Sequence, residues 1–202
     1  MRTMSGFAQN VVVQFPCNPR CDTLRHCILP SRKTMPTIFT DRLILRPQTI
    51  ADFAAWYPLY ADPVLMNGSG FTPEEGWNRL LRNIGHWTVF GYSIFTIRQK
   101  SNGALLGETG LAHFHRGIDE DADNCAEASW VISQSAQHKG IAKEAALAVH
   151  QWYVSTFLPS KTICLIAKDN TASRKVAEHI GYRISAECLY KGAECLKLEC
   201  RW

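Results

Sequence analysis

The sequence predicts an α/β (α+β) fold in which helices flank a mixed, mostly antiparallel sheet of six to seven strands. Two observations carry this prediction. Several short stretches alternate apolar and polar residues, and longer segments between them show the helical spacing of apolar residues. The elements follow the order strand, helices, three strands, helix, strand, helix, two strands. The 202 residues, 46% of them hydrophobic and 20% charged, suffice for one domain with a real core.

The first 34 residues differ from the remainder of the chain. They lack clear periodicity and carry three prolines. We therefore expect residues 1–34 to be an N-terminal extension outside the core fold and residues 35–202 to form the domain. The net charge of +4 arises partly in this extension, so the remaining chain is close to neutral and indicates no nucleic-acid partner.

The composition also bounds the compartment. No run approaches the ~18 apolar residues of a membrane span, so we expect no membrane partner. Eight cysteines are scattered along the chain, several inside apolar strand patterns. With no convincing signal peptide, we interpret them as reduced thiols of a cytoplasmic protein.

The first half of the domain starts with an alternating stretch, Ile38 to Arg46, which predicts a strand closed by Pro47. Thr72-Pro73-Glu74-Glu75 predicts a helix start, because it combines an N-cap, a proline at the first helical position and acids in the first turn. Two further strands are predicted over Tyr92 to Lys100 and Ala104 to Phe114. Ser101-Asn102-Gly103 between them is a hairpin signature.

The second half follows an acidic loop at 119–123. Asp169-Asn170-Thr171 predicts the cap of a helix that runs through Ile180 and ends at Gly181. The other predicted elements are a strand over Ala126 to Ser133, a helix over Ala142 to Phe157, a short apolar strand over Thr162 to Ala167, and a final hairpin of Arg183 to Tyr190 with Glu194 to Arg201 around Gly192.

A small-residue turn, Gln137-His138-Lys139-Gly140-Ile141-Ala142, opens the helix that ends near Phe157. Such a turn presents unpaired backbone N–H groups, and the helix dipole adds partial positive charge there. It is thus a ready seat for a phosphate or pyrophosphate, with Lys139 and Lys143 beside it. A glycine that simply eases the chain into a core helix is the alternative. The spacing fits neither a Walker loop nor a dinucleotide-binding Gly-x-Gly-x-x-Gly motif.

Four separated motifs occur together in a specific order. They are Thr40-Asp41-Arg42-Leu43-Ile44-Leu45-Arg46, Ala126-Glu127-Ala128-Ser129-Trp130-Val131-Ile132, Gln137-x-x-Gly140-x-Ala142, and Asp169-Asn170-x-x-Ser173 with Gly181-Tyr182. With them, the chain from Thr37 to Trp202 resembles the GNAT superfamily of acyl-CoA-dependent N-acetyltransferases. Within that superfamily it looks most like the branch of ribosomal-protein N-terminal acetyltransferases.

The resemblance implies acetyl-CoA as the donor co-substrate. It implies that the pyrophosphate lies at the turn formed by Gln137, His138, Lys139, Gly140, Ile141 and Ala142. It also implies that Trp130, Val131 and Ile132 lie along the pantetheine arm and that Asn170 binds this arm from the far side. The strand over 126–133 and the strand over 162–167 would splay apart to admit the thioester.

Acetyl transfer to an amine needs a proton acceptor, an oxyanion donor and stabilisation of the departing thiolate. A backbone N–H near Val131 or Ile132 is our candidate for the oxyanion donor. Period-two alternation puts Glu127 on one strand face with Ser129 and Val131, and Glu127 is the first candidate for the base. Glu108 is the second candidate, and either carboxylate has a surface ion pair as its alternative role.

The thiolate partner is the remaining group. Many GNAT members place a tyrosine seven residues after the position of Asn170, but Ala177 stands there in this chain. The resemblance leaves Ser173, whose alternative role is ordinary helix capping.

The function that follows is transfer of an acetyl group from acetyl-CoA to a primary amine by direct attack on the thioester. The acceptor is a protein N-terminus, an amino acid or another small amine. A non-catalytic acyl-CoA-binding module and an antibiotic-modifying acetyltransferase are the alternatives. We expect no metal, since His113-x-His115 has no evident third ligand, and a monomer or homodimer.

Overall fold

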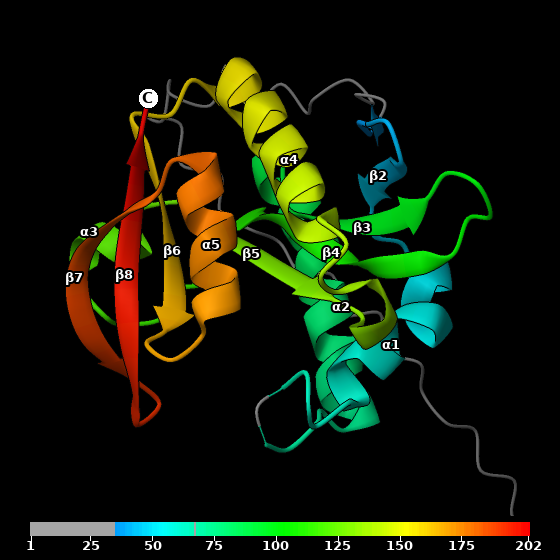
Figure 1. Cartoon of the computed structure of the whole chain (residues 1–202), viewed down its shortest axis with the longest axis horizontal. Helices are drawn as coiled ribbons and strands as arrows, with labels where there is room; N and C mark the ends of the chain where they lie inside the picture. Colours follow the sequence, from blue (N-terminus) through cyan, green and yellow to red (C-terminus); the bar gives the residue numbers. More distant parts are fainter. Residues whose placement is uncertain (1–34, 67) are drawn as a thin grey trace, which may run out of the picture. The chain divides into compact units, whose positions relative to one another are not determined.

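An eight-stranded sheet forms the centre of the computed structural model, which describes residues 35–66 and 68–202 (Figure 1). The predicted extension over residues 1–34 lies outside the described residues. The strand order is β1-β2-β3-β4-β5-β6-β8-β7, and all neighbouring strands are antiparallel except β5 and β6. The predicted mixed, mostly antiparallel sheet with flanking helices is confirmed.

The strands are β1 (Ile38–Phe39), β2 (Leu43–Pro47), β3 (Ile94–Gln99), β4 (Leu105–Ala112), β5 (Glu127–Ile132), β6 (Lys161–Ala167), β7 (Arg183–Tyr190) and β8 (Ala193–Arg201). The α-helices are α1 (Phe53–Ala61), α2 (Pro73–Phe90), α3 (Glu120–Asp123), α4 (Ile141–Phe157) and α5 (Thr171–Ile180), and short 3-10 turns cover Ile50–Asp52 and Gln134–Ala136.

The sheet has more strands than the six to seven predicted, because the stretch expected as one strand over Ile38 to Arg46 folds back on itself. Thr40 exchanges backbone and side-chain hydrogen bonds with Leu43, which closes a turn between β1 and β2. Ile38 then pairs with Leu45 across the turn. Alternation alone does not distinguish one strand from two strands joined by so tight a turn.

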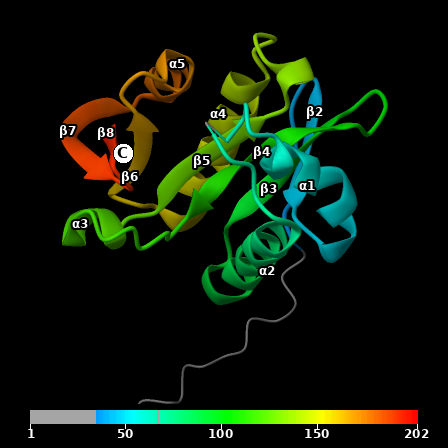
Figure 2. The ribbon, with the colours of Figure 1, turned by 90° about the horizontal axis from the view of Figure 1, so that it is seen from below.

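Helices cover both faces of the sheet (Figure 2). On one face, α4 and α5 bury Ala145, Val149 and Val176 in the main core. On the other face, α1 and α2 bury Trp56 and Leu80 in a second cluster, against which Val131 of β5 packs. The sheet therefore separates two apolar layers, and β5 contributes to both. No helix among residues 35–66 and 68–202 is long and apolar enough to cross a membrane.

Local signals set the helix ends where the sequence placed them. Thr72 and Glu75 form a reciprocal capping box at the start of α2, with Pro73 at its first position. Asn170 caps α5 by accepting from the Ser173 amide, and Gly181 ends it in the left-handed conformation. These caps satisfy the backbone groups that helix ends leave unpaired.

One local expectation differs from the structure. The acidic loop at 119–123 contains α3, which Asp119 caps, and its carboxylates pair with lysines of the neighbouring strands: Asp119 with Lys197 and Asp121 with Lys161.

A buried carboxylate fixes the start of α1 to the sheet. Asp52 is 1% exposed and accepts hydrogen bonds from Arg46 of β2, from Arg98 of β3 and from Thr49. Burial raises the pKa of Asp52, but these hydrogen bonds outweigh burial and lower it to about 2. The carboxylate thus stays ionised and holds α1 in place beside β2 and β3.

Candidate active site

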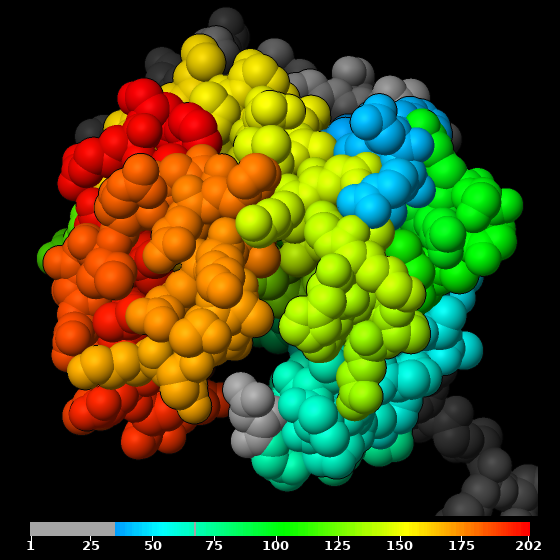
Figure 3. Space-filling view, viewed as in Figure 1, coloured from blue at the N-terminus to red at the C-terminus, as the bar shows by residue number. Residues whose placement is uncertain are grey.

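Strands β5 and β6 touch at one end only. Their single paired position is Glu127 with Ile163, where the Ile163 amide donates to the Ala126 carbonyl at 3.1 Å. Beyond this point the two strands diverge, and a cavity of about 200 Å³ lies between them. Figure 3 shows a recess beside α5 on this face of the molecule. The sheet is therefore open between β5 and β6, because these two strands do not pair beyond Glu127 and Ile163.

The cavity brings together side chains that are far apart in the sequence. It is lined by Arg116, Glu127, Ala128, Ser129, Trp130, Cys164, Leu165, Ile166, Ala167, Asn170 and Ser173. The Trp130 indole N–H donates to the Ser173 hydroxyl at 3.3 Å across the cavity. This bond joins β5 to the first turn of α5, so the hydroxyl of Ser173 is held at the cavity wall.

Glu127 lies at the closed end of the cavity and is 4% exposed. Arg116 holds it in a bidentate ion pair, with Nε and Nη2 each 2.7 Å from a carboxylate oxygen. Burial raises the pKa of Glu127, and the hydrogen bonds and charge of Arg116 offset only part of the rise. The carboxylate is thus a stronger base than an exposed glutamate, although Arg116 already occupies one hydrogen-bonding direction on each oxygen.

The free edge of β5 presents backbone amides to the cavity side. Because the Ala126 carbonyl bonds to β6 and backbone groups alternate between the two edges of a strand, the amides of Trp130 and Ile132 also point towards β6. By the same alternation the Val131 amide points to β4. Of the two amides considered for an oxyanion donor, Ile132 is the one on the open edge.

The turn between β5 and α4 has the backbone geometry expected of an anion-binding site. Gly140 caps α4 with φ 75°, and His138 also has a positive φ of 58°. The first intrahelical bond runs from the Glu144 amide to the Gly140 carbonyl at 3.1 Å, so the amides of Ile141 and Ala142 have no acceptor within the helix. Gln137 ties the turn to the end of β5, since its side-chain amide donates to the Ile132 carbonyl.

One carboxylate lies in the first turn of α4, and the structure neutralises it. Glu144 accepts from Thr40 at 2.5 Å and from Arg42 at 2.6 Å, which lowers its pKa against the effect of burial. Arg42 also donates to the Lys139 carbonyl. Thr40 and Arg42 of the first strand motif thereby bind the turn and neutralise the Glu144 carboxylate at the helix N-terminus.

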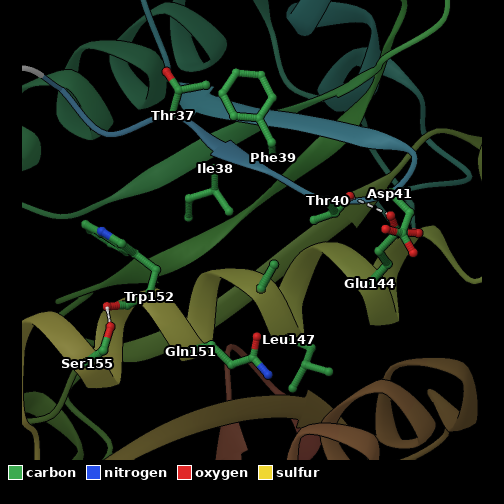
Figure 4. Close-up of a pocket in the computed structure, with 11 residues that line it drawn as sticks. Thr37, Ile38, Phe39, Thr40, Asp41, Glu144, Leu147, Gln151, Trp152 and Ser155 are labelled. Atoms are coloured by element: carbon green, nitrogen blue, oxygen red, sulfur yellow. Dashed lines mark hydrogen bonds between the residues drawn. The ribbon is translucent and has the colours of Figure 1, made fainter.

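A larger groove of about 770 Å³ runs between β1 and α4 (Figure 4). Figure 4 shows Thr40 bonded to Glu144 at one end and Trp152 at the other. Asp41 and Glu144 are its charged groups, and Glu144 is already paired with Arg42. The smaller cavity between β5 and β6 contains the buried Glu127 carboxylate, the Ser173 hydroxyl and the Asn170 amide, so we take it as the candidate active site.

Glu108 lies in the layer beneath α1 and α2, not among the residues that line the cavity. It is 1% exposed and accepts from Gln48 at 2.6 Å, Trp56 at 2.5 Å, Tyr60 and Arg79. Asn83 in turn donates to Gln48. Both carboxylate oxygens are therefore occupied by donors from α1, α2 and the segment after β2.

The structure thus sorts the predicted residues into three places. Glu127, Trp130, Asn170 and Ser173 line one cavity, the turn from Gln137 to Ala142 follows at the end of β5, and Glu108 lies in the buried network. The cavity also contains Arg116 and Cys164, which the sequence did not indicate. Arg116 is in an irregular segment after β4, without a motif around it. Within the described parts of the chain, no group of three or more His, Cys, Asp and Glu side chains is placed to hold a metal ion.

A family model, "Acetyltransferase (GNAT) domain", matches residues 42–183. The chain therefore belongs to the GNAT family of acetyltransferases. The match covers the first strand motif from Arg42 onward, the cavity and the turn before α4. The GNAT resemblance read from the four motifs is confirmed at this level.

Solved structures share this GNAT fold. A protein described as a GnaT-family acetyltransferase from Bordetella pertussis is 29% identical, with a TM-score of 0.77 over 81% of this chain and 98% of its own. An acetyltransferase from Agrobacterium tumefaciens str. C58 is 26% identical, with a TM-score of 0.72 over 84% and 96%. The ribosomal L7/L12 alpha-N-protein acetyltransferase RimL, solved with coenzyme A, is 16% identical, with a TM-score of 0.68 over 82% and 98%. At that identity the likeness to RimL shows the fold alone.

The network around Glu108 generates a stability prediction. Glu108→Gln is expected to lower the free energy of unfolding by about 3 kcal/mol, because it leaves Arg79 without its buried partner and sets an amide N–H₂ against other donors. Urea unfolding measures the change. Glu178→Gln on the exposed side of α5 is the control and should stay within about 0.5 kcal/mol of the parent protein. A loss below about 1 kcal/mol in Glu108→Gln would show that the network does not hold α1 and α2 to the sheet.

Proposed function

We propose that this GNAT protein transfers an acetyl group from acetyl-CoA to a primary amine by direct attack of the amine on the thioester. The observation that carries the proposal is the opening between β5 and β6. It is lined by the buried carboxylate of Glu127 and by the Ser173 hydroxyl, which accepts a hydrogen bond from Trp130. Acyl transfer needs this combination of a proton acceptor, a thiolate partner and free amide donors in one place.

The residues present fit the acetyl-CoA co-substrate. The unpaired amides in the first turn of α4, with the exposed Lys139 and Lys143 beside them, suit the pyrophosphate. Glu144 would oppose an anion there, but Arg42 and Thr40 neutralise it. Asn170 and Ser173 at the cavity wall offer polar groups to the pantetheine arm. RimL was solved with coenzyme A, and the microcin C7 self-immunity acetyltransferase MccE with acetyl-CoA and AMP.

The proposed roles follow from position. Glu127 takes a proton from the acceptor's ammonium group, directly or through one water, so that the free amine can attack the thioester, and burial keeps Glu127 basic enough to do so. The Ile132 amide on the open edge donates to the oxyanion. The Ser173 hydroxyl donates to the sulfur as the C–S bond breaks, while Trp130 donates to the same hydroxyl oxygen and orients it. Glu108 has no open direction for a substrate proton in its network.

The acceptor class rests on the branch resemblance. Ribosomal-protein acetyltransferases share the fold at 16–18% identity, so we propose a protein N-terminus before an amino acid or another small amine. The proposal is tested by thiol release from acetyl-CoA with a panel of peptides, amino acids, simple amines and aminoglycosides. Release with any amine, with an acetylated product detected by mass spectrometry, supports transfer. Binding of coenzyme A without release under any acceptor would support a non-catalytic binding module instead.

Gly140→Glu is expected to weaken coenzyme A binding at least about tenfold, because its carboxylate lies beside the unpaired amides of α4. Isothermal titration calorimetry measures the affinity. Gly140→Gln is the matched control, since it imposes the same strain at a positive φ without the charge. Equal affinities of the Glu and Gln variants would place the pyrophosphate elsewhere.

Glu127→Gln is expected to lower turnover about a hundredfold at pH values below the acceptor's own pKa, with the affinity for coenzyme A kept. The deficit should shrink above that pKa, where the amine is already deprotonated and no base is needed. A pH–rate profile with saturating acetyl-CoA measures both effects. The same profile is recorded for Glu108→Gln, and comparison of the two variants identifies which carboxylate acts as the base. An unaffected rate in Glu127→Gln would exclude Glu127 from that role.

A further inference from the structure

Three arginines gather beside the closed end of the cavity, on the face that α2 covers. The guanidinium of Arg116, itself a cavity residue, lies 4.9 Å from the ring centre of Phe114 and 4.7 Å from that of Tyr190. Arg82 of α2 lies over the same Phe114 ring at 5.3 Å. One turn earlier on α2, Arg79 lies 4.4 Å from the ring centre of Tyr60. Aromatic rings thus position all three groups, which we call the arginine cluster.

One member of the arginine cluster has no carboxylate partner. Glu127 pairs with Arg116, and Glu108 lies 3.3 Å from Arg79. Asp123, whose charge also acts on Glu127, accepts from the Gly117 amide. Among the residues that the structure describes, Arg82 has no carboxylate within ion-pair distance, and its guanidinium lies 3.5 Å from the Asn83 amide oxygen. The charge of Arg82 therefore remains available for a ligand.

The groups of the arginine cluster act on one another electrostatically. Partial desolvation and the positive charges of Arg79 and Arg116 lower the pKa of Arg82, which keeps an exposed surface, against the opposing effects of Tyr60 and Glu108. The charge of Arg79 also reaches Glu127 at the cavity. Bringing like charges together is unfavourable, and an anion placed among them would relieve this repulsion.

We infer that the acceptor of this enzyme carries an anionic group, a carboxylate or a phosphate, close to its reacting amine, and that Arg82 and Arg116 bind this group. The inference rests on the proposed function and names its substrate class. Guanidinium forks match the oxygens of carboxylates and phosphates, and aromatic contacts hold the forks in place.

The arginine cluster also discriminates between acceptors. Its positive charge repels acceptors that bear only positive charge, which sets a polycationic antibiotic apart from an amino acid. The arginine cluster thus selects the acceptor by its charge.

Matched pairs of acceptors test the inference by thiol release from acetyl-CoA. The pairs are serine and serinamide, phosphoethanolamine and ethanolamine, and two otherwise identical peptides that begin Ser-Asp or Ser-Asn, all with the same kind of amine within a pair. We expect the anionic member of at least one pair to have a kcat/KM about tenfold higher than its neutral partner. The pair that shows this ratio identifies the α-carboxylate, the phosphate or the acidic side chain as the source of the anion.

Arg82→Gln should reduce this ratio at least about fivefold, mainly through the KM of the anionic acceptor. Arg201→Gln is the control, because Arg201 lies on β8 with its side chain 71% exposed and outside the cavity. It should leave the ratio as in the parent protein. A ratio near one in every pair of the parent protein, or a preference for the neutral members, would overturn the inference while upholding acetyl transfer to amines.

Absence of thiol release with every amine would overturn the proposed function instead, and the arginine cluster can then be tested by binding. Calorimetry with N-acetylserine and N-acetylserinamide, each in the presence of coenzyme A, compares an anionic with a neutral product. Tighter binding of N-acetylserine that Arg82→Gln abolishes supports the anion site. Equal binding of both compounds, or equal binding by the parent protein and Arg82→Gln, rejects it.

Discussion

The divergence of β5 from β6 is the constraint on which the other features of the site depend. Every other neighbouring pair of strands is antiparallel and paired at two or more positions, whereas these two strands are paired at Glu127 and Ile163 alone. A ladder continued beyond that point would pair the amides of Trp130 and Ile132 and close the cavity. The separation leaves those amides free, and it requires the layers on either side of the sheet to keep the two halves in position.

Buried ion pairs perform this task on the side of α1 and α2. Asp52 with Arg46 and Arg98 fixes the start of α1, and Glu108 joins β4 to both helices. Each carboxylate is nearly inaccessible and has several donors, so removing one partner would leave an uncompensated charge. Aromatic packing around Trp56 and Tyr60 surrounds these pairs. The layer between the sheet and the helices α1 and α2 is therefore a preorganised polar layer rather than a purely apolar one.

The two sides of the opening differ in chemical character. Towards α4 and α5 it presents free amides, Asn170 and Ser173, which suit a phosphate-bearing thioester donor. Towards α2 it presents Glu127 and Arg116, which is one member of the arginine cluster. If the acceptor carries an anion, both substrates are held by positive or N–H-rich groups, and Glu127 is the one carboxylate among the cavity residues. In this proposal Arg116, which pairs with Glu127, would connect acceptor binding to the proposed proton acceptor.

The sequence by itself determined the elements whose signals are local. The capping box at Thr72, the caps of α5 at Asn170 and Gly181, the Gly140 turn and both long hairpins follow from residues within a few positions of each other. Tertiary structure decided the features that join distant segments. It turned Glu144 towards Arg42. It also placed Glu108 in a closed network and Glu127 at the cavity wall, although both are strand carboxylates in the sequence. Arg116 acquires its position from Phe114, Tyr190 and Glu127 together, and no pattern around it carries that information, because the three contacts come from different strands and loops.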